Sequence, residues 1–504
     1  MLRLTSPADR APYLMDASNF HGGHAEGVVF PENEKEVIDF LRQCDAGGVP
    51  ITVAGNGTGL AGGRIPFGGW VLATSKLSGM RMSAQSSPGA AARTVVGPGI
   101  PLKEVQAEAA RAGLFYPSDP TSILSFLGGN VATNASGSRA FKYGVTRDHV
   151  FRLRVVLASG EVAEIPRGKF FAAADGRLDI PVMAPSGTIS TRVVRIPGFK
   201  IPAIKHAAGY FVKPGMDAID LFIGSEGTLG VVTEIELDLL PVPAQVIAFV
   251  VFFSNEEDAW NFSEEAQFQT LENRKRRNDA RVQSRSFEYM DKGALDLVRF
   301  KYPEIPACAA AALYLEQECQ PETADILLEQ WSRLFEKHHA VPENFWYAET
   351  EEEQQKFKAF RHEIPLQVKA LLLKYGQTKV GTDYAVPHEH FRAMFGYEKK
   401  RLAEEELYGV SFGHMADCHL HLNVLPRNAD EHARAWRLYN DLISQALRWG
   451  GTVSAEHGVG KLKVDFLRQM FGDRAIREMA GLKKQLDPNG ILGRGTLFPE
   501  SLLK

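Results

Sequence analysis

Two short stretches of the sequence concentrate side chains that can bind a metal ion or move a proton. The first, residues 413–423, contains His414, His419, His421 and Asn423, and the second, residues 454–460, contains Glu456 and His457. On a strand, alternate residues share one face, so His419, His421 and Asn423 would lie together. Two imidazoles and a carboxylate are a common divalent-metal ligand set, so His414, His421 and Glu456 are candidates to converge on a cation.

The alternative for any single histidine is a polar strand residue with an ordinary hydrogen-bond partner. Four of the chain's 14 histidines fall in this small set, beside an acid. That concentration favours the functional interpretation.

Two glycine-rich stretches have the composition of ligand-binding loops. Residues 117–144 combine glycines with short polar side chains and few charges, which is typical of backbone that approaches a ligand closely. Within residues 55–63, Gly57 to Gly62 match the dinucleotide pattern G-x-G-x-x-G, but Pro66 and a following strand disfavour the helix that a Rossmann fold requires. We therefore expect a strand-loop-strand turn whose N–H groups bind an anion such as a pyrophosphate.

Composition excludes several classes of protein. A formal charge of −4 and a pI near 6.4 leave no broad basic surface, so nucleic acid is not expected as a partner. The four cysteines form no Cys-x-x-Cys pair, which fits a reducing compartment. No apolar run approaches the ~20 residues that cross a bilayer. We expect a soluble cytoplasmic protein without a transmembrane segment, with peripheral attachment to a membrane left open.

A domain boundary is expected at the Pro241–Pro243 region. There, strand patterns give way to alternating strands and long helices. This change predicts a second, α+β domain with a mainly antiparallel sheet. Residues 166–202 show no clear periodicity and are expected to form an insertion loop. Residues 351–373 are helical in pattern, with a kink or break expected before Pro365.

Six ordered motifs resemble the FAD-linked oxidases of the vanillyl-alcohol oxidase type. They are Gly55-Asn-Gly-Thr-Gly-Leu-Ala-Gly-Gly, Gly128-Gly-Asn with Asn134-Ala-Ser-Gly, Lys205-His-Ala-Ala-Gly-Tyr, Gly224-Ser-Glu-Gly-Thr-Leu-Gly, Glu456-His-Gly-Val-Gly and Leu486-Asp-Pro-Asn-Gly-Ile-Leu. Within that type the chain is similar to the group of D-lactate dehydrogenase, the glycolate oxidase flavin subunit and D-2-hydroxyglutarate dehydrogenase. The similarity runs from about Asp16 to Phe498.

The resemblance implies an α+β fold with a two-part FAD-binding domain and a ferredoxin-like antiparallel-sheet cap. Residues 1–243 would form the FAD-binding domain, residues 244–451 the substrate-covering cap, and residues 452–504 a segment that returns to the FAD domain. Some relatives carry a flavin-linking histidine in the first turn, where Asn56 and Thr58 stand here, so non-covalent FAD is expected.

The residues that would contact FAD follow from the same motifs. They are Gly55, Asn56, Gly57, Thr58, Gly59, Leu60, Gly62, Pro117, Ser118, Asp119, Gly129, Asn130, Thr133, Asn134, Ser136, Gly137, Tyr143, Gly144, Glu226, Gly227, Gly230 and Val231.

The resemblance also assigns roles around the substrate. His414, His421 and Glu456 would hold a divalent metal, Zn²⁺ or Mn²⁺, and His457 would be the general base. Asn423 would orient the substrate. Arg361 and Lys379 are weaker matches to the family's cationic residues that hold the substrate carboxylate. For these two residues, a solvated helix arginine and a strand-edge lysine are equally good interpretations.

Several positions depart from the family's usual pattern. Ala416 and Cys418 stand where glycines are frequent, His206 stands where asparagine is frequent, and residues 493–496, Gly-Arg-Gly-Thr, replace Asn-Pro-Gly-Lys. These changes predict a narrower pocket and different contacts at the flavin edge.

The function implied is FAD-dependent oxidation of a D-2-hydroxy acid of the D-lactate, D-2-hydroxyglutarate or glycolate class to the 2-oxo acid. The electrons would pass to a protein or quinone rather than to NAD, with an iron-sulfur partner subunit as one candidate, and a homo-oligomer is expected. The alternatives are a transferase like alkylglycerone-phosphate synthase and a non-catalytic flavin subunit. The metal triad and the complete Glu456-His457 pair disfavour them.

Overall fold

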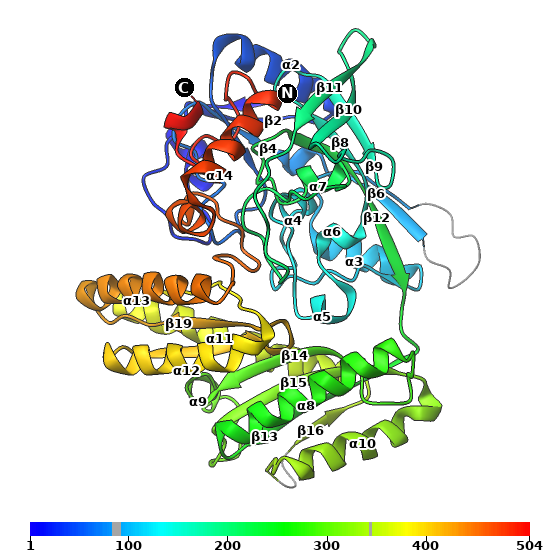
Figure 1. Cartoon of the computed structure of the whole chain (residues 1–504), viewed down its shortest axis with the longest axis vertical. Coiled ribbons are helices and arrows are strands. Elements are labelled where there is room, and N and C mark those ends of the chain that lie inside the picture. Colours follow the sequence, from blue (N-terminus) through cyan, green and yellow to red (C-terminus); the bar gives the residue numbers. More distant parts are fainter. Residues whose placement is uncertain (83–91, 342–344, 504) are drawn as a thin grey trace. The chain divides into compact units, whose positions relative to one another are not determined.

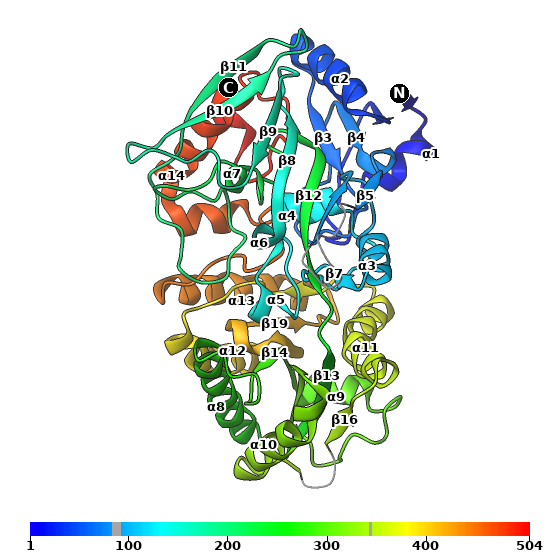
Figure 2. The ribbon, with the colours of Figure 1, turned by 90° about the vertical axis from the view of Figure 1, so that its right-hand side faces the viewer.

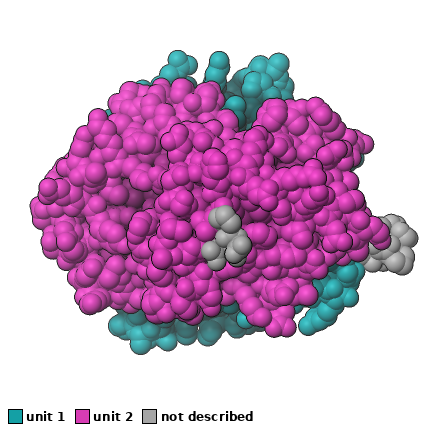
Figure 3. All heavy atoms as spheres, turned by 90° about the horizontal axis from the view of Figure 1, so that it is seen from below, with its two compact units in different colours: residues 1–137, 144–242, 453–504 teal, residues 138–143, 243–452 magenta. Residues whose placement is uncertain are grey.

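The computed structural model describes residues 1–82, 92–341 and 345–503. Its contacts divide the chain into two compact units (Figures 1 and 3). Unit 1 contains residues 1–137, 144–242 and 453–504, and unit 2 contains residues 138–143 and 243–452. None of the helices in the described ranges is both long and apolar enough to span a bilayer.

Unit 1 begins with a small four-stranded sheet in the order β1-β2-β4-β3. Its elements are β1 (Leu2–Leu4), α1 (Pro7–Arg10), β2 (Gly27–Phe30), α2 (Glu34–Gly47), β3 (Ile51–Ala54) and β4 (Trp70–Ala73). The helix α2 starts where the Asn33 side chain accepts a hydrogen bond from Glu36 N and ends at Gly48 in the left-handed conformation. As predicted, no helix intervenes between β3 and β4.

An antiparallel sheet of eight strands forms the rest of unit 1, in the order β11-β10-β9-β8-β12-β6-β5 with β7 beside β12. Figure 2 shows β9, β8 and β12 side by side. The elements are β5 (Met80–Met82), β6 (Ala92–Val96), α3 (Leu102–Arg111), β7 (Leu114–Phe115), α4 (Leu127–Thr133), α6 (Thr146–His149), β8 (Val150–Val156), β9 (Val162–Pro166), β10 (Arg177–Met183), β11 (Ile189–Arg195), α7 (Ile219–Phe222) and β12 (Val231–Pro241).

The prediction of an irregular loop over residues 166–202 was wrong, because this segment contains the β10–β11 hairpin. Leu178, Ile180 and Val182 alternate inward along β10 and are buried against the unit. Gly, Pro and Ala around the hairpin hid this period of two in the sequence.

The end of the chain returns to unit 1, through α14 (Val464–Leu486) and the segment after it. Ile51 N donates to Ile491 O at 2.7 Å, and Gly493 N donates to Ile51 O at 2.9 Å. The returning segment thus pairs with β3, directly before the glycine-rich turn at residue 55.

Unit 2 is built on a seven-stranded antiparallel sheet in the order β16-β13-β15-β14-β18-β19-β17. Its strands are β13 (Gln245–Phe253), β14 (Ser284–Asp291), β15 (Ala311–Cys319), β16 (Trp346–Ala348), β17 (Val380–Gly381), β18 (Gly409–His414) and β19 (His419–Val424). Its helices are α5 (Ala140–Tyr143), α8 (Glu256–Lys275), α9 (Lys292–Val298), α10 (Ala324–Lys337), α11 (Glu351–Tyr375), α12 (His388–Glu404) and α13 (Ala429–Arg448). The antiparallel sheet predicted for the second domain is confirmed.

Of the kink or break predicted before Pro365, the break does not occur, because α11 continues as one helix through this proline. An internal proline costs a helix about 3 kcal/mol. Phe357, Phe360, Ile364 and Val368 of α11 lie in the core of unit 2. Burial of each such side chain contributes roughly 1.5–3 kcal/mol, so their sum outweighs the proline.

Candidate functional site

The turn after β3 in unit 1 has the form of an anion cradle. Gly57 (φ 74°) and Gly62 (φ 71°) adopt the left-handed conformation that other residues rarely reach. No group in the described part of the chain accepts a hydrogen bond from the backbone N–H groups of residues 56–61. Amide donors presented in this way suit a phosphate.

Two glycines border open space beside this turn. A Cβ added at Gly59 or Gly129 would meet no described atom within 4 Å, whereas one at Gly128 would lie 2.5 Å from Pro98 Cβ. Asn130 is 3% exposed, yet its Nδ2 donates to no group among the described residues. Unpaired amides, open space and an unsatisfied buried donor fit a cofactor held here.

Other residues predicted to contact FAD hold the loops of unit 1 in shape. Asn56 Nδ2 donates to Leu124 O at 2.7 Å, and Asn134 Oδ1 accepts from Arg147 N at 2.9 Å. Ser118 Oγ donates to Ala135 O at 3.2 Å. These side chains join the 117–144 stretch to its neighbours.

Glycines at two further predicted positions permit close packing. A Cβ on Gly137 would lie 2.1 Å from Asp119 O, and one on Gly144 would lie 2.2 Å from Asp148 Oδ2. Tyr143 belongs to unit 2, where its hydroxyl donates to Glu318, and burial together with that carboxylate raises its pKa.

The 226–231 stretch supports the returning segment. Glu226 accepts hydrogen bonds from Val459 N at 2.8 Å and from Gly460 N at 2.7 Å. Burial raises the pKa of Glu226 to about 7, although these two bonds oppose the rise. A Cβ on Gly230 would lie 2.4 Å from Val155 Cγ1, so close packing between β8 and the start of β12 requires glycine there.

Lys461 is a residue of this region that the sequence did not single out. Its Nζ donates to Thr496 Oγ1 at 2.9 Å and to Gly63 O at 3.1 Å, next to the cradle. Burial lowers its pKa to about 8. Thr496 stands where the family pattern often has lysine, so Lys461 brings an ammonium to that position from another segment. The missing lysine was the signal that could have pointed to it.

Glu456 lies in unit 1 in a strongly polar setting. Its Oε1 accepts hydrogen bonds from Lys205 Nζ at 2.5 Å and from Ser136 Oγ at 2.6 Å. Glu456 is 8% exposed, whereas its neighbour His457 is partly exposed. Lys205 opens one of the family motifs, which was the signal for this contact.

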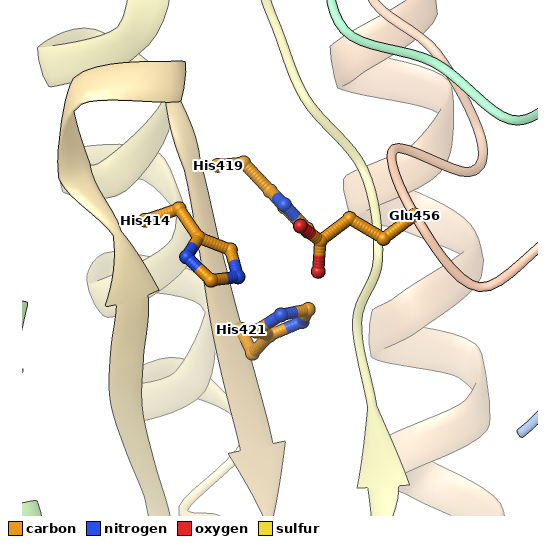
Figure 4. A group of neighbouring side chains, drawn as sticks. All are labelled: His414, His419, His421 and Glu456. Atoms are coloured by element: carbon orange, nitrogen blue, oxygen red, sulfur yellow. The ribbon is translucent and has the colours of Figure 1, made fainter. Parts of the chain in front are cut away.

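Three histidines of unit 2 come together on the β18–β19 hairpin, where their imidazoles turn toward one another (Figure 4). His414 pairs with His419 and Phe412 pairs with His421 in the strand register. Ring nitrogens of His414, His419 and His421 lie within 4.8 Å of one another. His419 and His421 are alternate residues of β19 and so share one face of the sheet, as the sequence predicts.

Hydrogen bonds orient two of these imidazoles for metal binding. His421 Nδ1 donates to Thr382 O at 3.0 Å, and His414 Nδ1 lies 2.6 Å from Glu288 Oε1. A carbonyl or carboxylate on Nδ1 leaves the lone pair of a neutral imidazole on Nε2. His419 differs, because its Nε2 lies 3.3 Å from Asp383 Oδ1 and its ring is fully buried.

Glu288 on β14 joins His414 to Arg361, and sequence reasoning missed it. Its Oε2 accepts from Arg361 Nε at 2.8 Å, and both side chains are buried. Burial would raise the pKa of Glu288, but the charge of Arg361 and the hydrogen bonds from Arg361 and His414 outweigh burial and lower the pKa to about 2. A charged residue inside the apolar strand Phe287–Met290 was the available signal.

Of the other residues predicted to contact the substrate, Asn423 lies on β19 and Lys379 directly precedes β17. Asn423 Oδ1 accepts from Lys379 Nζ at 3.2 Å, and Asn423 Nδ2 donates to His421 O at 3.1 Å. Asn423 is buried, so its amide is fixed beside the histidines.

Comparison with known proteins identifies the family. A model described as "FAD binding domain" matches residues 25–166, and one described as "FAD linked oxidases, C-terminal domain" matches residues 259–497. The glycolate oxidase subunit GlcD of Bacillus subtilis is 30% identical over 99% of this chain and 94% of its own length. The chain belongs to the FAD-linked oxidases.

Further relatives extend the comparison. A D-lactate dehydrogenase of Anaerostipes hadrus is 27% identical over 94% of this chain and 89% of its own. A D-2-hydroxyglutarate dehydrogenase of Xanthomonas citri pv. viticola is 27% identical over 99% and 94%. The solved structure of an alkyldihydroxyacetonephosphate synthase superposes with a TM-score of 0.65 at 15% identity, over 97% of this chain and 81% of that one, which shows a shared fold.

The protein is therefore an FAD-linked oxidoreductase with the α+β fold of the vanillyl-alcohol oxidase type, as predicted. FAD binding agrees with the cradle of unit 1. The imidazole donors on β18 and β19 are suitable ligands for a divalent metal.

Proposed function

We propose that this FAD-linked oxidase dehydrogenates a D-2-hydroxy acid of the D-lactate, D-2-hydroxyglutarate or glycolate class to the 2-oxo acid. The observation that carries the proposal is the orientation of His414 and His421, whose Nδ1 atoms are held by Glu288 and Thr382. Imidazoles oriented in this way are prepared for a divalent metal, and metal binding suits a substrate with adjacent carboxylate and hydroxyl oxygens.

We assign the metal to His414, His421 and Glu456, with Zn²⁺ or Mn²⁺ as the ion. Such an ion lowers the pKa of a bound hydroxyl, as it does for bound water. The Lys205 ammonium and the Ser136 hydroxyl on Glu456 favour its ionised form, which is the form that a metal requires.

Arg361 is the best candidate in unit 2 to hold the substrate carboxylate. Glu288 engages its Nε, while no described group accepts a hydrogen bond from its two terminal nitrogens. A guanidinium with these nitrogens available can form the paired hydrogen bonds that a carboxylate accepts. Lys379 and the Asn423 amide that it contacts would orient the rest of the substrate.

His457 is the proposed general base. Its imidazole would take the hydroxyl proton as the carbon–oxygen double bond forms and the hydrogen on Cα leaves with two electrons. FAD, when bound in the unit 1 cradle, supplies the acceptor for that hydride. Turnover then requires removal of two electrons by a protein or quinone. An iron-sulfur partner subunit is one such acceptor, since the relative GlcD is named as a subunit.

An anaerobic titration of the purified flavoprotein tests this function. The protein, chelated or supplied with Zn²⁺ or Mn²⁺, is mixed with D-lactate, glycolate or D-2-hydroxyglutarate while the flavin spectrum is recorded. We expect one acid to bleach the flavin only when metal is present. His457→Gln should keep FAD but lose the bleaching, with His339→Gln, whose side chain is 78% exposed, as a matched control.

Three outcomes would contradict the proposal. A bound flavin that no hydroxy acid reduces would favour the transferase chemistry suggested by the alkyldihydroxyacetonephosphate synthase fold. If chelation left the bleaching unchanged, the proposed role of the metal would be wrong. Full reduction of the flavin in His457→Gln would show that His457 is not the general base.

A further inference from the structure

The β10–β11 hairpin of unit 1 ends the large sheet with an unusually open edge. Strand β11 pairs only with β10 among the described strands. Ile196 N donates to Gly176 O and Ala184 N donates to Thr188 O, which places the hydrogen-bonded pairs at even-numbered residues. The N–H and C=O groups of Ile189, Thr191 and Val193 therefore point away from β10.

The open part of this edge has clear limits. At Arg195 the edge is closed, because Arg195 N donates to Gln485 Oε1 of α14 at 2.8 Å and Gln485 Nε2 donates to Arg195 O at 3.3 Å. No described group accepts from the backbone N–H of Ile189, Thr191 or Val193. The open edge thus covers residues 189–193.

The open edge carries exposed aliphatic side chains. Ile189 is 76% exposed and Val193 is 49% exposed, and Met183, the partner of Ile189 on β10, is 39% exposed. Natural edge strands usually carry lysine, proline or a bulge that discourages pairing. Residues 189–193, Ile-Ser-Thr-Arg-Val, contain no lysine or proline, and their β10 register has no bulge. Their single charged side chain, Arg192, is paired with Glu161.

We propose that β11 pairs with β11 of a second copy of this chain, antiparallel and with Thr191 on the two-fold axis. In this register Ile189 lies opposite Val193 of the other copy, and Thr191 lies opposite Thr191. Aliphatic and Thr–Thr pairs of this kind stabilise neighbouring strands. The outward N–H and C=O groups at these positions then satisfy one another.

The charges on β11 agree with the same register. Arg192 falls opposite Ser190 and Arg195 falls opposite Gly187, so no two arginines face each other across the axis. Arg192 is also neutralised within its own copy, since its Nη2 lies 2.6 Å from Glu161 Oε2. A two-fold axis makes both copies use the same surface, which closes the assembly as a dimer.

Sedimentation of the full-length FAD-loaded protein is the first test. We expect a concentration-dependent dimer, and a monomer for Ile189→Lys/Val193→Lys at concentrations where the parent is dimeric. The matched control, Arg177→Lys/Asp179→Lys on the neighbouring strand, should remain dimeric. A parent that is monomeric throughout, or a lysine variant that stays dimeric, overturns the proposal.

A cysteine cross-link tests the register. Hydrogen-bonded antiparallel partners have Cα atoms about 5.5 Å apart, within the span of a disulfide. In a Cys308→Ser background, which removes the exposed native thiol, Thr191→Cys should give a disulfide-linked dimer on mild oxidation. Ser190→Cys should not form this disulfide, because residue 190 lies opposite residue 192, and not residue 190, of the other copy. Equal cross-linking of both variants, or of neither, overturns the register. Flavin content and reduction by substrate are read on the same samples, so failure of the dimer is distinguishable from failure of the proposed chemistry.

Discussion

Glu288 Oε1 and His414 Nδ1 lie 2.6 Å apart, joining two strands of the unit 2 sheet through residues 126 positions apart in the sequence. The carboxylate fixes the imidazole's tautomer and also holds Arg361 by its Nε. One buried side chain therefore orients both a proposed metal ligand and a proposed carboxylate-binding cation.

Replacement of Glu288 by Gln should weaken metal binding about 10–100-fold. The amide oxygen can still accept from His414, but it removes the negative charge that increases the basicity of the imidazole. Competition for Zn²⁺ against a chromophoric chelator measures the change. Glu329→Gln, at an exposed Arg333 pair, is the control and should bind as the parent does. Unchanged affinity in Glu288→Gln would mean that His414 is not a ligand.

Gly129→Leu should yield a folded protein without flavin. A Cβ at Gly129 enters open space beside the cradle, and leucine in place of a helical glycine favours α4 by up to about 1 kcal/mol. The side chain then occupies the space assigned to FAD. Flavin absorbance per chain should fall at least about tenfold, an effect equivalent to the loss of about 1.4 kcal/mol of binding energy, while the far-ultraviolet spectrum stays unchanged.

The neighbouring position provides the contrast. Gly128→Ala places a methyl 2.5 Å from Pro98 Cβ, so it should lower the unfolding temperature through overpacking of about 1–3 kcal/mol. Normal FAD content in Gly129→Leu would show that the cofactor does not lie against this glycine.

Lys461→Met should raise the FAD dissociation constant by about tenfold, since a hydrogen bond from a charged group contributes about 1.5–3 kcal/mol. The change removes the bonds to Gly63 O and Thr496 Oγ1 that hold the end of the cradle. Fluorescence of released FAD on dilution measures it. Thr496→Lys in the same background should restore retention, because it returns a lysine to the position where the family pattern often has one. A double variant that retains FAD no better than Lys461→Met would refute this exchange.

Glu398 makes the stability of unit 2 depend on pH. It is buried against Tyr384 and Ser411, and burial raises its pKa to about 7, above the ordinary value of 4.5. The folded state therefore holds a proton that the unfolded state has released. The stability that this proton provides is complete below pH 4.5 and is lost as the pH rises to about 7, by up to about 3 kcal/mol.

Glu398→Gln should remove this dependence. The variant should unfold at a higher temperature than the parent at pH 8 and lose less stability between pH 5 and 7, as measured by thermal denaturation across that range. Glu404→Gln, on the exposed side of the same helix, should keep the parent profile. Parallel pH profiles for Glu398→Gln and the parent would contradict the raised pKa.

Local patterns in the sequence determined individual turns and the faces of individual strands. Gly57 and Gly62 predicted the turn between β3 and β4, and the alternation of His419, His421 and Asn423 predicted their shared strand face. Such features depend on φ preference and on the period of a strand, which a few consecutive residues specify.

Only the tertiary structure decided the contacts between distant segments. Glu288 meets His414, Lys461 reaches Thr496, and Ser136 bonds Glu456 across 320 residues. The unbroken α11 and the β10–β11 hairpin also depend on burial against other elements. Strand register and core packing place these residues, and both are set by long-range contacts that no local pattern in the chain contains.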